Sequence, residues 1–259
     1  MRSASRCRTR SLRAATEGLL RPLADSAVAI LLAPLCAACR RPLDHPTRGA
    51  VCPLCWSSII PITPPCCGTC GDPLPSWRSV SVAEALCPRC RRTKPLVSLA
   101  RSIGPYEGTL RAIVHALKYD GRPTLARHLA AHMRVAGTDV LAGADLVVPV
   151  PLHRSRERVR GFNQARELAR HLGLPVADAL ARSRRTTSQA DLPAAKRHAN
   201  VRGAFVCRAD ANVKGRTIVL VDDVSTTGAT LNACAAPLLA AGATAVRALT
   251  AARAVARLP

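Results

Sequence analysis

The sequence predicts an α/β fold, with a parallel sheet flanked by helices, behind an N-terminal four-cysteine zinc-binding module. Two observations predict it. Nine of the twelve cysteines lie between positions 36 and 90, and eight of these form Cys-x2-Cys pairs. Beyond position 95, short apolar runs alternate with segments whose apolar residues recur at helical spacing, which is the pattern of a parallel sheet. We therefore expect a basic segment with a helix at 1–34, a double zinc-ribbon-like module at 35–95 and an α/β domain at 96–259.

The N-terminal segment is not expected to direct export. Its early arginines and the apolar run 27–35 imitate a signal peptide, but Glu17, Arg21, Pro22 and Asp25 intervene, and no A-x-A site precedes Cys36. No apolar run reaches the roughly 18 residues that a membrane span needs. These features predict a cytoplasmic protein without stable membrane insertion.

Zinc is the expected ligand of the cysteine pairs. Two thiolates separated by two residues form a tight turn that offers both sulfurs to one ion, and two such turns complete a tetrahedral site. About two structural zinc ions are expected, with sequential or interleaved pairing, and Cys66 is an alternative to Cys67. A disulfide framework is the competing interpretation, and it requires an oxidising compartment. The predicted ligands are Cys36, Cys39, Cys52, Cys55, Cys67, Cys70, Cys87 and Cys90.

After a linker at 91–95, the alternating pattern defines the elements of the α/β domain. Strands are expected at 146–150, 217–221 and 244–250, and helices at 107–119, 124–136, 164–171 and 229–241. Pro237 lies inside the last helix and should kink it or shorten its first half.

Charge indicates the class of ligand. The chain has 38 Lys+Arg against 16 Asp+Glu, a formal net charge of +22, and residues 151–202 are its most basic part. A composition that is 48% hydrophobic excludes a disordered basic tail. The excess positive charge favours a phosphate-rich ligand or nucleic acid.

The most informative stretch is residues 218–230, IVLVDDVSTTGAT. A buried strand delivers Asp222 and Asp223 at its carboxyl end, and a hydroxyl-rich loop containing Gly228 then opens a helix. The amides and hydroxyls of such a loop hold a phosphate monoester, while two carboxylates accept hydrogen bonds from vicinal sugar hydroxyls, directly or through Mg²⁺.

This stretch resembles the signature of type I phosphoribosyltransferases, which bind 5-phosphoribosyl 1-diphosphate (PRPP). The resemblance implies that the ribose hydroxyls meet Asp222 and Asp223, and that the 5′-phosphate lies at 226–230. The PRPP contacts it implies are Asp222, Asp223, Ser225, Thr226, Thr227, Gly228, Ala229 and Thr230.

A second segment resembles the pyrophosphate loop of the same fold. Residues 145–153 contain a Pro-Val-Pro turn expected to expose backbone amides, and a basic run and 161-GFNQ-164 follow. Residues 185–201 resemble the flexible loop that closes over PRPP. The pyrophosphate contacts expected here are Val150, Pro151, Arg160, Asn163, Gln164 and Arg185.

Taken in order, the cysteine pairs, 116-ALKYDG-121, the Pro-Val-Pro turn, 160-RGFNQ-164 and the PRPP signature resemble the ComF family. That resemblance implies a PRPP-binding protein of DNA uptake and competence that handles single-stranded DNA with a competence helicase or another DNA-processing protein. Two alternatives stay open: an active phosphoribosyltransferase acting on a nucleobase or amine, and a PRPP-sensing regulator. Thr226 stands where purine-salvage members commonly have an acidic residue, so a mechanism that uses that carboxylate has no support.

Overall fold

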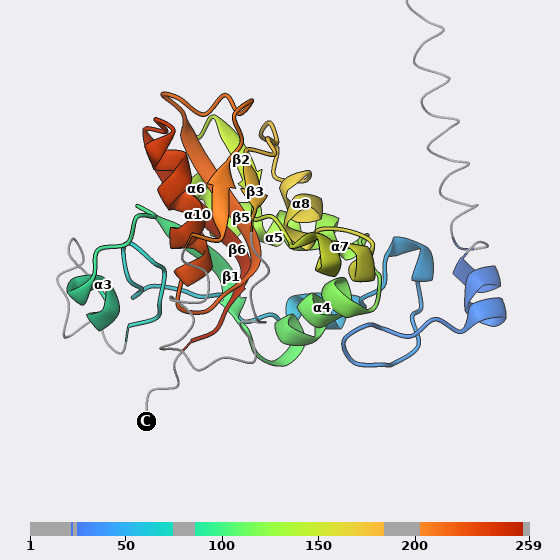
Figure 1. Ribbon diagram of the computed structural model, residues 1–259. Helices are drawn as coiled ribbons and strands as arrows, with labels where there is room; N and C mark the ends of the chain where they lie inside the picture. Colours follow the sequence, from blue (N-terminus) through green and yellow to red (C-terminus); the bar gives the residue numbers. More distant parts are fainter. Residues whose placement is uncertain (1–21, 23–24, 75–85, 184–202, 256–259) are drawn as a thin grey trace, which may run out of the picture. The chain divides into compact units, whose positions relative to one another are not determined.

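The computed structural model describes residues 22, 25–74, 86–183 and 203–255, and it divides the chain into two compact units, 1–58 and 59–259 (Figure 1). In the first unit, residues 25–32 are helical, followed by the 3-10 helix η1 (Pro46–Arg48) and α2 (Pro53–Ser57). Asp25 is buried and accepts hydrogen bonds from the backbone amide and hydroxyl of Thr47, which ties that helix to η1.

The described part of the second unit is built on a four-stranded parallel sheet in the order β1-β6-β5-β2. The strands are β1 (Ala100–Pro105), β2 (Leu146–Pro149), β5 (Thr217–Ser225) and β6 (Ala245–Arg253). A separate antiparallel pair consists of β3 (Leu180–Arg182) and β4 (Phe205–Cys207). All four strands of the main sheet run in the same direction, so their carboxyl ends meet at one edge.

Helices cover both faces of this sheet, as a buried parallel sheet requires (Figure 1). On one face α10 (Ala229–Ala240) packs on β5 and β6, with Leu231 and Leu238 meeting Ile218 and Leu220 in one core. On the other face lie α4 (Gly108–Tyr119), α5 (Leu125–Ala136) and α8 (Gln164–Ala169). The remaining described helices are α3 (Pro88–Arg92), α6 (Thr138–Leu141) and α7 (Arg154–Arg160).

The predicted fold class is confirmed, while several boundaries differ. The strand expected at 217–221 continues to Ser225, because its pairing with β6 runs on to Arg253. β1, β3 and β4 were not predicted, since they are short or contain polar residues and glycine. The expected shortening by Pro237 is wrong: α10 runs through it, and the Pro237 carbonyl still accepts a bond from the Ala241 amide.

Within the described residues, no helix is both long enough and apolar enough to cross a bilayer.

Candidate functional site

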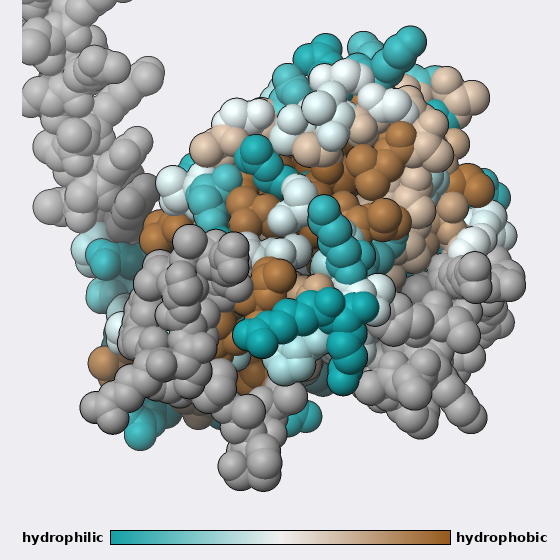
Figure 2. Space-filling view, turned by 90° about the vertical axis from the view of Figure 1, so that its left-hand side faces the viewer, coloured by the Kyte–Doolittle hydropathy of each residue, from teal (hydrophilic) through white to brown (hydrophobic). Residues whose placement is uncertain are grey.

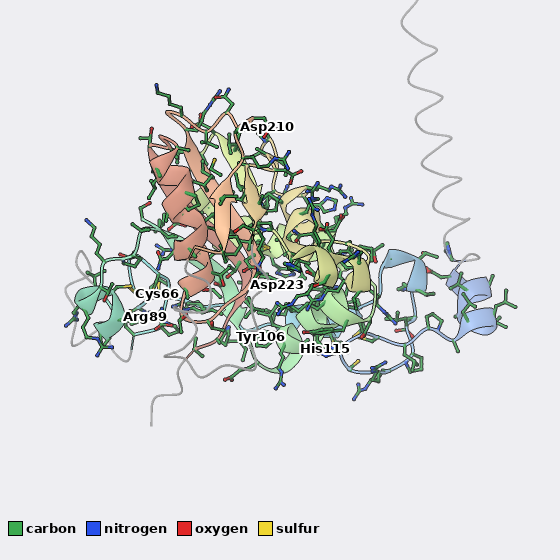
Figure 3. The ribbon with its side chains drawn as sticks, viewed as in Figure 1. Cys66, Arg89, Tyr106, His115, Asp210 and Asp223 are labelled. Atoms are coloured by element: carbon green, nitrogen blue, oxygen red, sulfur yellow. The ribbon has the colours of Figure 1, made fainter. Side chains whose placement is uncertain are left out.

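The last residues of β5 place two carboxylates at the carboxyl edge of the sheet. Asp222 and Asp223 lie inside the paired strand rather than beyond it, and the backbone amide of Asp223 donates to Oδ1 of Asp222 over 2.8 Å. Figure 3 shows Asp223 near Tyr106 at this end of the sheet, with Asp210 toward the other end. Nζ of Lys118, from α4, lies 2.9 Å from Oδ1 of Asp223.

Burial and a neighbouring negative charge control the protonation of Asp222. Removal from water, reinforced by the neighbouring Asp223 charge, raises the pKa of Asp222 to about 7. Burial disfavours the ammonium of Lys118, but the attraction of Asp223 more than offsets it, so the pKa of Lys118 is raised. The site therefore holds a charged lysine against one carboxylate of an acidic pair.

The loop after β5 leads directly into the first turn of the helix α10. Gly228 is the N-cap residue and has φ 76°, a left-handed conformation that favours glycine. Oγ1 of Thr227 accepts a hydrogen bond from the Ala229 amide over 3.3 Å. The first turn of α10 contains no acidic residue. The positive end of the helix dipole is thus directed at the loop, and the arrangement suits a phosphate.

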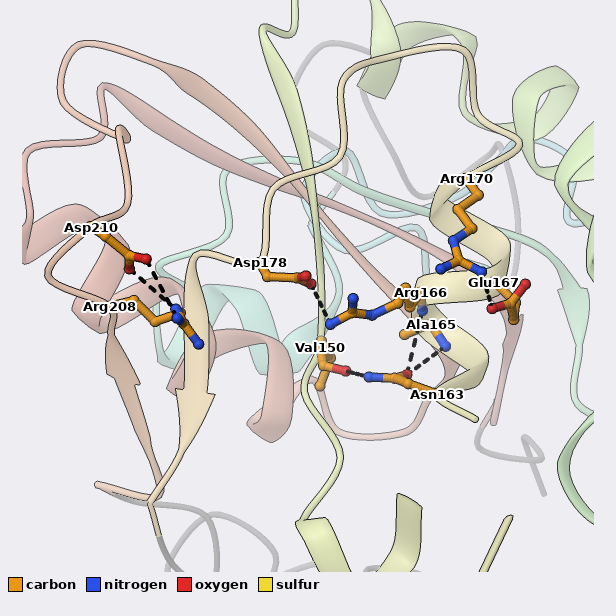
Figure 4. Close-up of polar contacts among 9 residues, drawn as sticks. All are labelled: Val150, Asn163, Ala165, Arg166, Glu167, Arg170, Asp178, Arg208 and Asp210. Atoms are coloured by element: carbon orange, nitrogen blue, oxygen red, sulfur yellow. Dashed lines mark hydrogen bonds and ion pairs between the residues drawn. The ribbon is translucent and has the colours of Figure 1, made fainter. Parts of the chain in front are cut away.

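The expected pyrophosphate loop follows β2, but one expectation about it is wrong. The amide of Val150 is not exposed, because it donates to the Val221 carbonyl over 2.9 Å. Pro151 has no N–H to offer. The Val150 carbonyl accepts from Nδ2 of Asn163 over 3.1 Å (Figure 4). The amide and the carbonyl of Val150 therefore stabilise the turn itself. Backbone amides that could donate to a pyrophosphate would have to come from the residues that follow Pro151.

Asn163 and Gln164 are both buried, and Asn163 is fully engaged in hydrogen bonds to the backbone. Oδ1 of Asn163 accepts from the amides of Ala165 and Arg166, so the side chain caps α8 while its other end holds Val150 (Figure 4). Gln164 is 1% exposed, and its Nε2 is buried without a hydrogen-bond partner.

Arg160, another predicted pyrophosphate contact, is partly exposed. Its guanidinium carbon lies 4.9 Å from the centre of the Tyr119 ring, and that ring also contacts the tilted ring of His115, with centroids 4.7 Å apart. Arg185 and the loop expected to close over PRPP lie outside the described residues.

The eight predicted zinc ligands form two clusters in sequential pairing. Cys36, Cys39, Cys52 and Cys55 make one, and Cys67, Cys70, Cys87 and Cys90 make the other, with all sulfurs of a cluster within 4.8 Å of one another. Interleaved pairing is thereby excluded, and Cys66 lies outside the second cluster.

Sulfur separations within the clusters fit a tetrahedral zinc ion. Zn–S bonds of about 2.3 Å place neighbouring sulfurs about 3.8 Å apart. Cys36 and Cys55 are separated by 3.8 Å, Cys39 and Cys52 by 3.9 Å, and Cys70 and Cys87 by 3.7 Å. Every cysteine in the described part of the chain is a free thiol, so the disulfide alternative has no support there.

Comparison with known proteins agrees with this arrangement. Residues 158–258 match the phosphoribosyl transferase domain, and residues 27–91 match the double zinc ribbon domain. The DNA utilization protein YhgH of Escherichia coli K12 is 34% identical over 171 residues, which are 62% of this chain and 74% of that protein. The chain belongs to the ComF family.

Two further relatives carry the family's name. Competence protein F of Haemophilus influenzae is 32% identical over 157 residues, 56% of this chain and 69% of that protein. Competence protein ComFC of Bacillus subtilis is 30% identical over 168 residues, 61% of this chain and 68% of that protein.

In this ComF-family chain the second cysteine cluster lies beside the loop after β5. Nη1 of Arg89, from α3, donates to the Thr226 carbonyl over 3.4 Å, and Nη2 lies 3.7 Å from the sulfur of Cys70. Nε of Arg253, at the end of β6, donates to Oδ1 of Asp72 over 2.7 Å, and its Nη2 lies 3.4 Å from the same sulfur. Two arginines thus join the ribbon to the sheet beside the site.

Lys118 lies within the motif 116–121, but the sequence alone predicts no role for it. The sequence shows only a lysine at the end of an amphipathic helix. No feature of the neighbouring residues indicates that its side chain reaches β5. Arg89 and Arg253 were missed for a similar reason, because the residues they contact are 137 and 181 positions away in the chain.

Proposed function

We propose that this ComF-family protein binds PRPP at the carboxyl end of β5. The observation that carries the proposal is the conjunction of the Asp222–Asp223 pair, the loop at Gly228 and the open amino end of α10 on one continuous strand-loop-helix unit. The carboxylates accept hydrogen bonds from the ribose hydroxyls, and the loop from Ser225 to Thr230 holds the 5′-phosphate.

Mg²⁺ accompanies PRPP in this proposal. The pyrophosphate group and the carboxylates of Asp222 and Asp223 supply the oxygen ligands that this ion prefers. Arg160, at the end of α7, supplies positive charge to the pyrophosphate, while Asn163 holds the turn through Val150. Arg185 is proposed as a further pyrophosphate contact.

The proposed biological role is the handling of single-stranded DNA during uptake, in the cytoplasm, with a competence helicase or another DNA-processing protein as partner. The names of the YhgH and competence relatives support it, as does the net charge of +22. Free thiols in two zinc-type clusters are consistent with a reducing compartment. With 2% aromatic residues, the contact with DNA is expected to be mainly ionic.

Calorimetric titration of zinc-replete protein with PRPP and Mg²⁺ tests the ligand. The double variant Asp222→Asn/Asp223→Asn should bind PRPP at least roughly thirtyfold more weakly, because two carboxyl groups that accept hydrogen bonds from the ribose are replaced by amides. Asp210→Asn, at the other end of the sheet, is the matched control and should bind like the parent. Absence of measurable PRPP binding by the parent protein, or equal binding by all three proteins, rejects the proposal.

Titration with an unstructured single-stranded oligonucleotide at several salt concentrations tests the DNA role. Ionic contact with several phosphates predicts a steep linear fall of log affinity with log salt, with a slope of about −0.7 for each phosphate neutralised. A flat dependence, or no binding at low salt, contradicts ionic recognition of DNA. Because the oligonucleotide titration needs no PRPP, its result is independent of the calorimetric titration with PRPP.

A further inference from the structure

The guanidinium group of Arg89 contacts both the second cysteine cluster and the loop after β5. Nη1 donates to the Thr226 carbonyl over 3.4 Å, and Nη2 lies 3.7 Å from the sulfur of Cys70. Arg89 is half-buried in the helix α3, next to the cluster member Cys90 (Figure 3). One side chain thus joins a cysteine expected to bind zinc to the loop proposed to hold the 5′-phosphate.

The bond from Arg89 fixes the direction of one peptide group in this loop. The peptide between Thr226 and Thr227 is planar and trans, so its carbonyl and its N–H point in opposite directions. Because the carbonyl is directed at Arg89, the Thr227 amide is directed away from it. Within the described part of the chain, that amide has no hydrogen-bond acceptor. Arg89 therefore positions a free donor that suits a phosphate oxygen.

Cys70 also holds a second arginine that borders the loop. Nη2 of Arg253 lies 3.4 Å from the Cys70 sulfur. In the sheet Arg253 is paired with Ser225, the last residue of β5, and the Ala254 amide donates to the Ser225 carbonyl over 2.8 Å. The end of β5 and the loop that follows it are thus both connected to one sulfur, through Arg253 and Arg89 respectively.

Direct packing contributes little to this connection. The apolar residues around the second cluster form a core of their own, separate from the core to which α10 belongs. A cavity of about 350 Å³ lies between them, lined by Cys70 and Arg89 on one side and by Gly228 and Leu231 on the other. Figure 2, which views the side of the molecule on the left of Figure 1, shows strongly polar side chains lying over apolar surface. The cluster and the loop are therefore connected by long polar side chains, so one substitution can interrupt the connection.

The Cys70 sulfur is held in place by the zinc ion that the second cluster is expected to bind. Four thiolates within 4.8 Å of one another repel, and a bound Zn²⁺ offsets that repulsion and fixes each sulfur at bonding distance. A thiolate acceptor also strengthens the bonds from both arginines, because hydrogen bonds to ions are roughly twice as strong as those between neutral groups. When the second cluster loses its ion, Arg89 loses one of its two anchors.

We propose that Arg89 is a positioning residue that couples the second cysteine cluster to the loop after β5. Zinc in this cluster holds Cys70, Cys70 holds Arg89, and Arg89 orients the Thr227 amide for an anionic ligand. The affinity of the loop for the 5′-phosphate of PRPP therefore depends on zinc. This last step rests on the proposed function, whereas the link between cluster and loop does not. The first cluster, which includes Cys36, belongs to the other compact unit and takes no part.

Hydrogen–deuterium exchange of the ligand-free chain, followed by mass spectrometry, tests the link without PRPP. The segment 226–232 should exchange faster than in the parent in Arg89→Gln and in Cys67→Ser, which removes a ligand of the second cluster. Cys36→Ser, which removes a ligand of the first cluster, and Arg91→Gln, an exposed position on α3, are the matched controls and should exchange like the parent. Unchanged exchange in α5 shows that the α/β domain of each variant stays folded.

Calorimetric titration with PRPP and Mg²⁺ then measures the effect on the ligand. Arg89→Gln should bind PRPP roughly fivefold or more weakly than the parent, whereas Arg91→Gln should bind like the parent. Arg89→Lys keeps the charge but lacks the planar fork that reaches two acceptors at once, so it should resemble Arg89→Gln. Parent-like behaviour of Arg89→Lys would show a general effect of charge and overturn the positioning role.

Zinc affinity provides the reciprocal measurement, because coupling between two ligands acts equally in both directions. Equilibrium competition with a chromogenic chelator should show one of the two zinc sites becoming roughly fivefold tighter when the parent is saturated with PRPP and Mg²⁺. The other site should not change, and Arg89→Gln should show no change at either site.

The two proposals fail in different ways. If the parent binds no PRPP while exchange at 226–232 still responds to Arg89→Gln and Cys67→Ser, the PRPP proposal is rejected and the link between cluster and loop is retained. If PRPP binds, but Arg89→Gln matches the parent in PRPP affinity and in exchange, the link is overturned. It is also overturned if Cys36→Ser changes the exchange of this segment as much as Cys67→Ser does.

Discussion

Lys118, near the end of α4, places its ammonium nitrogen 2.9 Å from Oδ1 of Asp223 on β5. The two side chains are only 14% and 13% exposed. The ligand-free protein therefore neutralises one carboxylate of its acidic pair with a cation of its own. A ligand that uses both carboxylates must share Asp223 with this lysine or displace it.

Replacing Lys118 should destabilise the ligand-free protein. Lys118→Met removes the cation that pairs with Asp223, and breaking a largely buried ion pair on one side is costly. We expect the free energy of unfolding at pH 7.5 to fall by about 1–3 kcal/mol in a urea titration. Lys214→Met removes an exposed lysine and is the matched control. If both variants are equally stable, the ion pair does not hold α4 against the sheet.

The raised pKa of Asp222 predicts a stability that depends on pH. The folded chain keeps the Asp222 proton up to pH about 7, whereas an unfolded aspartate loses it near about 4. Between these values the folded state binds more protons, so the contribution of Asp222 is fully present below about pH 4 and is lost as the pH rises through about 7.

Asp222→Asn removes this titration and keeps an acceptor for the Asp223 amide. The stability of the variant relative to the parent should rise by on the order of 2 kcal/mol between pH 5 and pH 7 and then level off, in urea titrations across that range. Asp210→Asn should show no such gain, since Arg208 lowers the pKa of that carboxyl. If the difference in the free energy of unfolding between Asp222→Asn and the parent does not change with pH, the raised pKa of Asp222 is contradicted.

The sequence was most informative where one function occupies one continuous segment. The strand, the two carboxylates, Gly228 and the following helix are neighbours in the chain, so residues 218–230 predict both the fold and the site. Each of the four Cys-x2-Cys motifs is likewise contained in a short segment and was recognised from the sequence. Which two motifs form one cluster became clear only from the structure.

What the sequence could not predict depends on distant contacts. The Val150 amide was expected to be exposed, but the adjacent strand β5 takes it through the Val221 carbonyl. Pro237 was expected to shorten a helix that packing on β5 and β6 keeps continuous. Lys118 and Arg253 act on residues far along the chain, and no periodicity in their own segments indicates those partners.

Arg253 should control how firmly the second cluster holds zinc. It is 2% exposed and bridges Asp72 and the Cys70 sulfur, so it fixes a ligand from outside the metal site. Loss of such a group typically weakens metal binding about 10–100-fold. Replacing Arg253 removes its contacts with both Asp72 and the Cys70 sulfur. Asp72→Asn should have a smaller effect, since it removes only the charge of Asp72 and leaves Arg253 in place.

Zinc release to a chromogenic chelator measures this effect. Arg253→Gln and, to a smaller degree, Asp72→Asn should speed the release of one equivalent of zinc and leave the other unchanged. Arg247→Gln, on the same strand, contacts only backbone carbonyls near α6 and should release zinc as the parent does. Faster loss of both equivalents, or of neither, contradicts a specific link between Arg253 and the second cluster.

Adjacent cysteines offer the sharpest test of the ligand assignment. Cys67 belongs to the second cluster and Cys66 does not, although both precede the same turn. We expect about two zinc ions in the purified parent and about one in either Cys36→Ser or Cys67→Ser, because a site that loses one of four thiolates no longer closes. Cys66→Ser should retain both ions, as measured by elemental analysis after gel filtration. Loss of an ion from Cys66→Ser but not from Cys67→Ser would reverse the assignment of these neighbours.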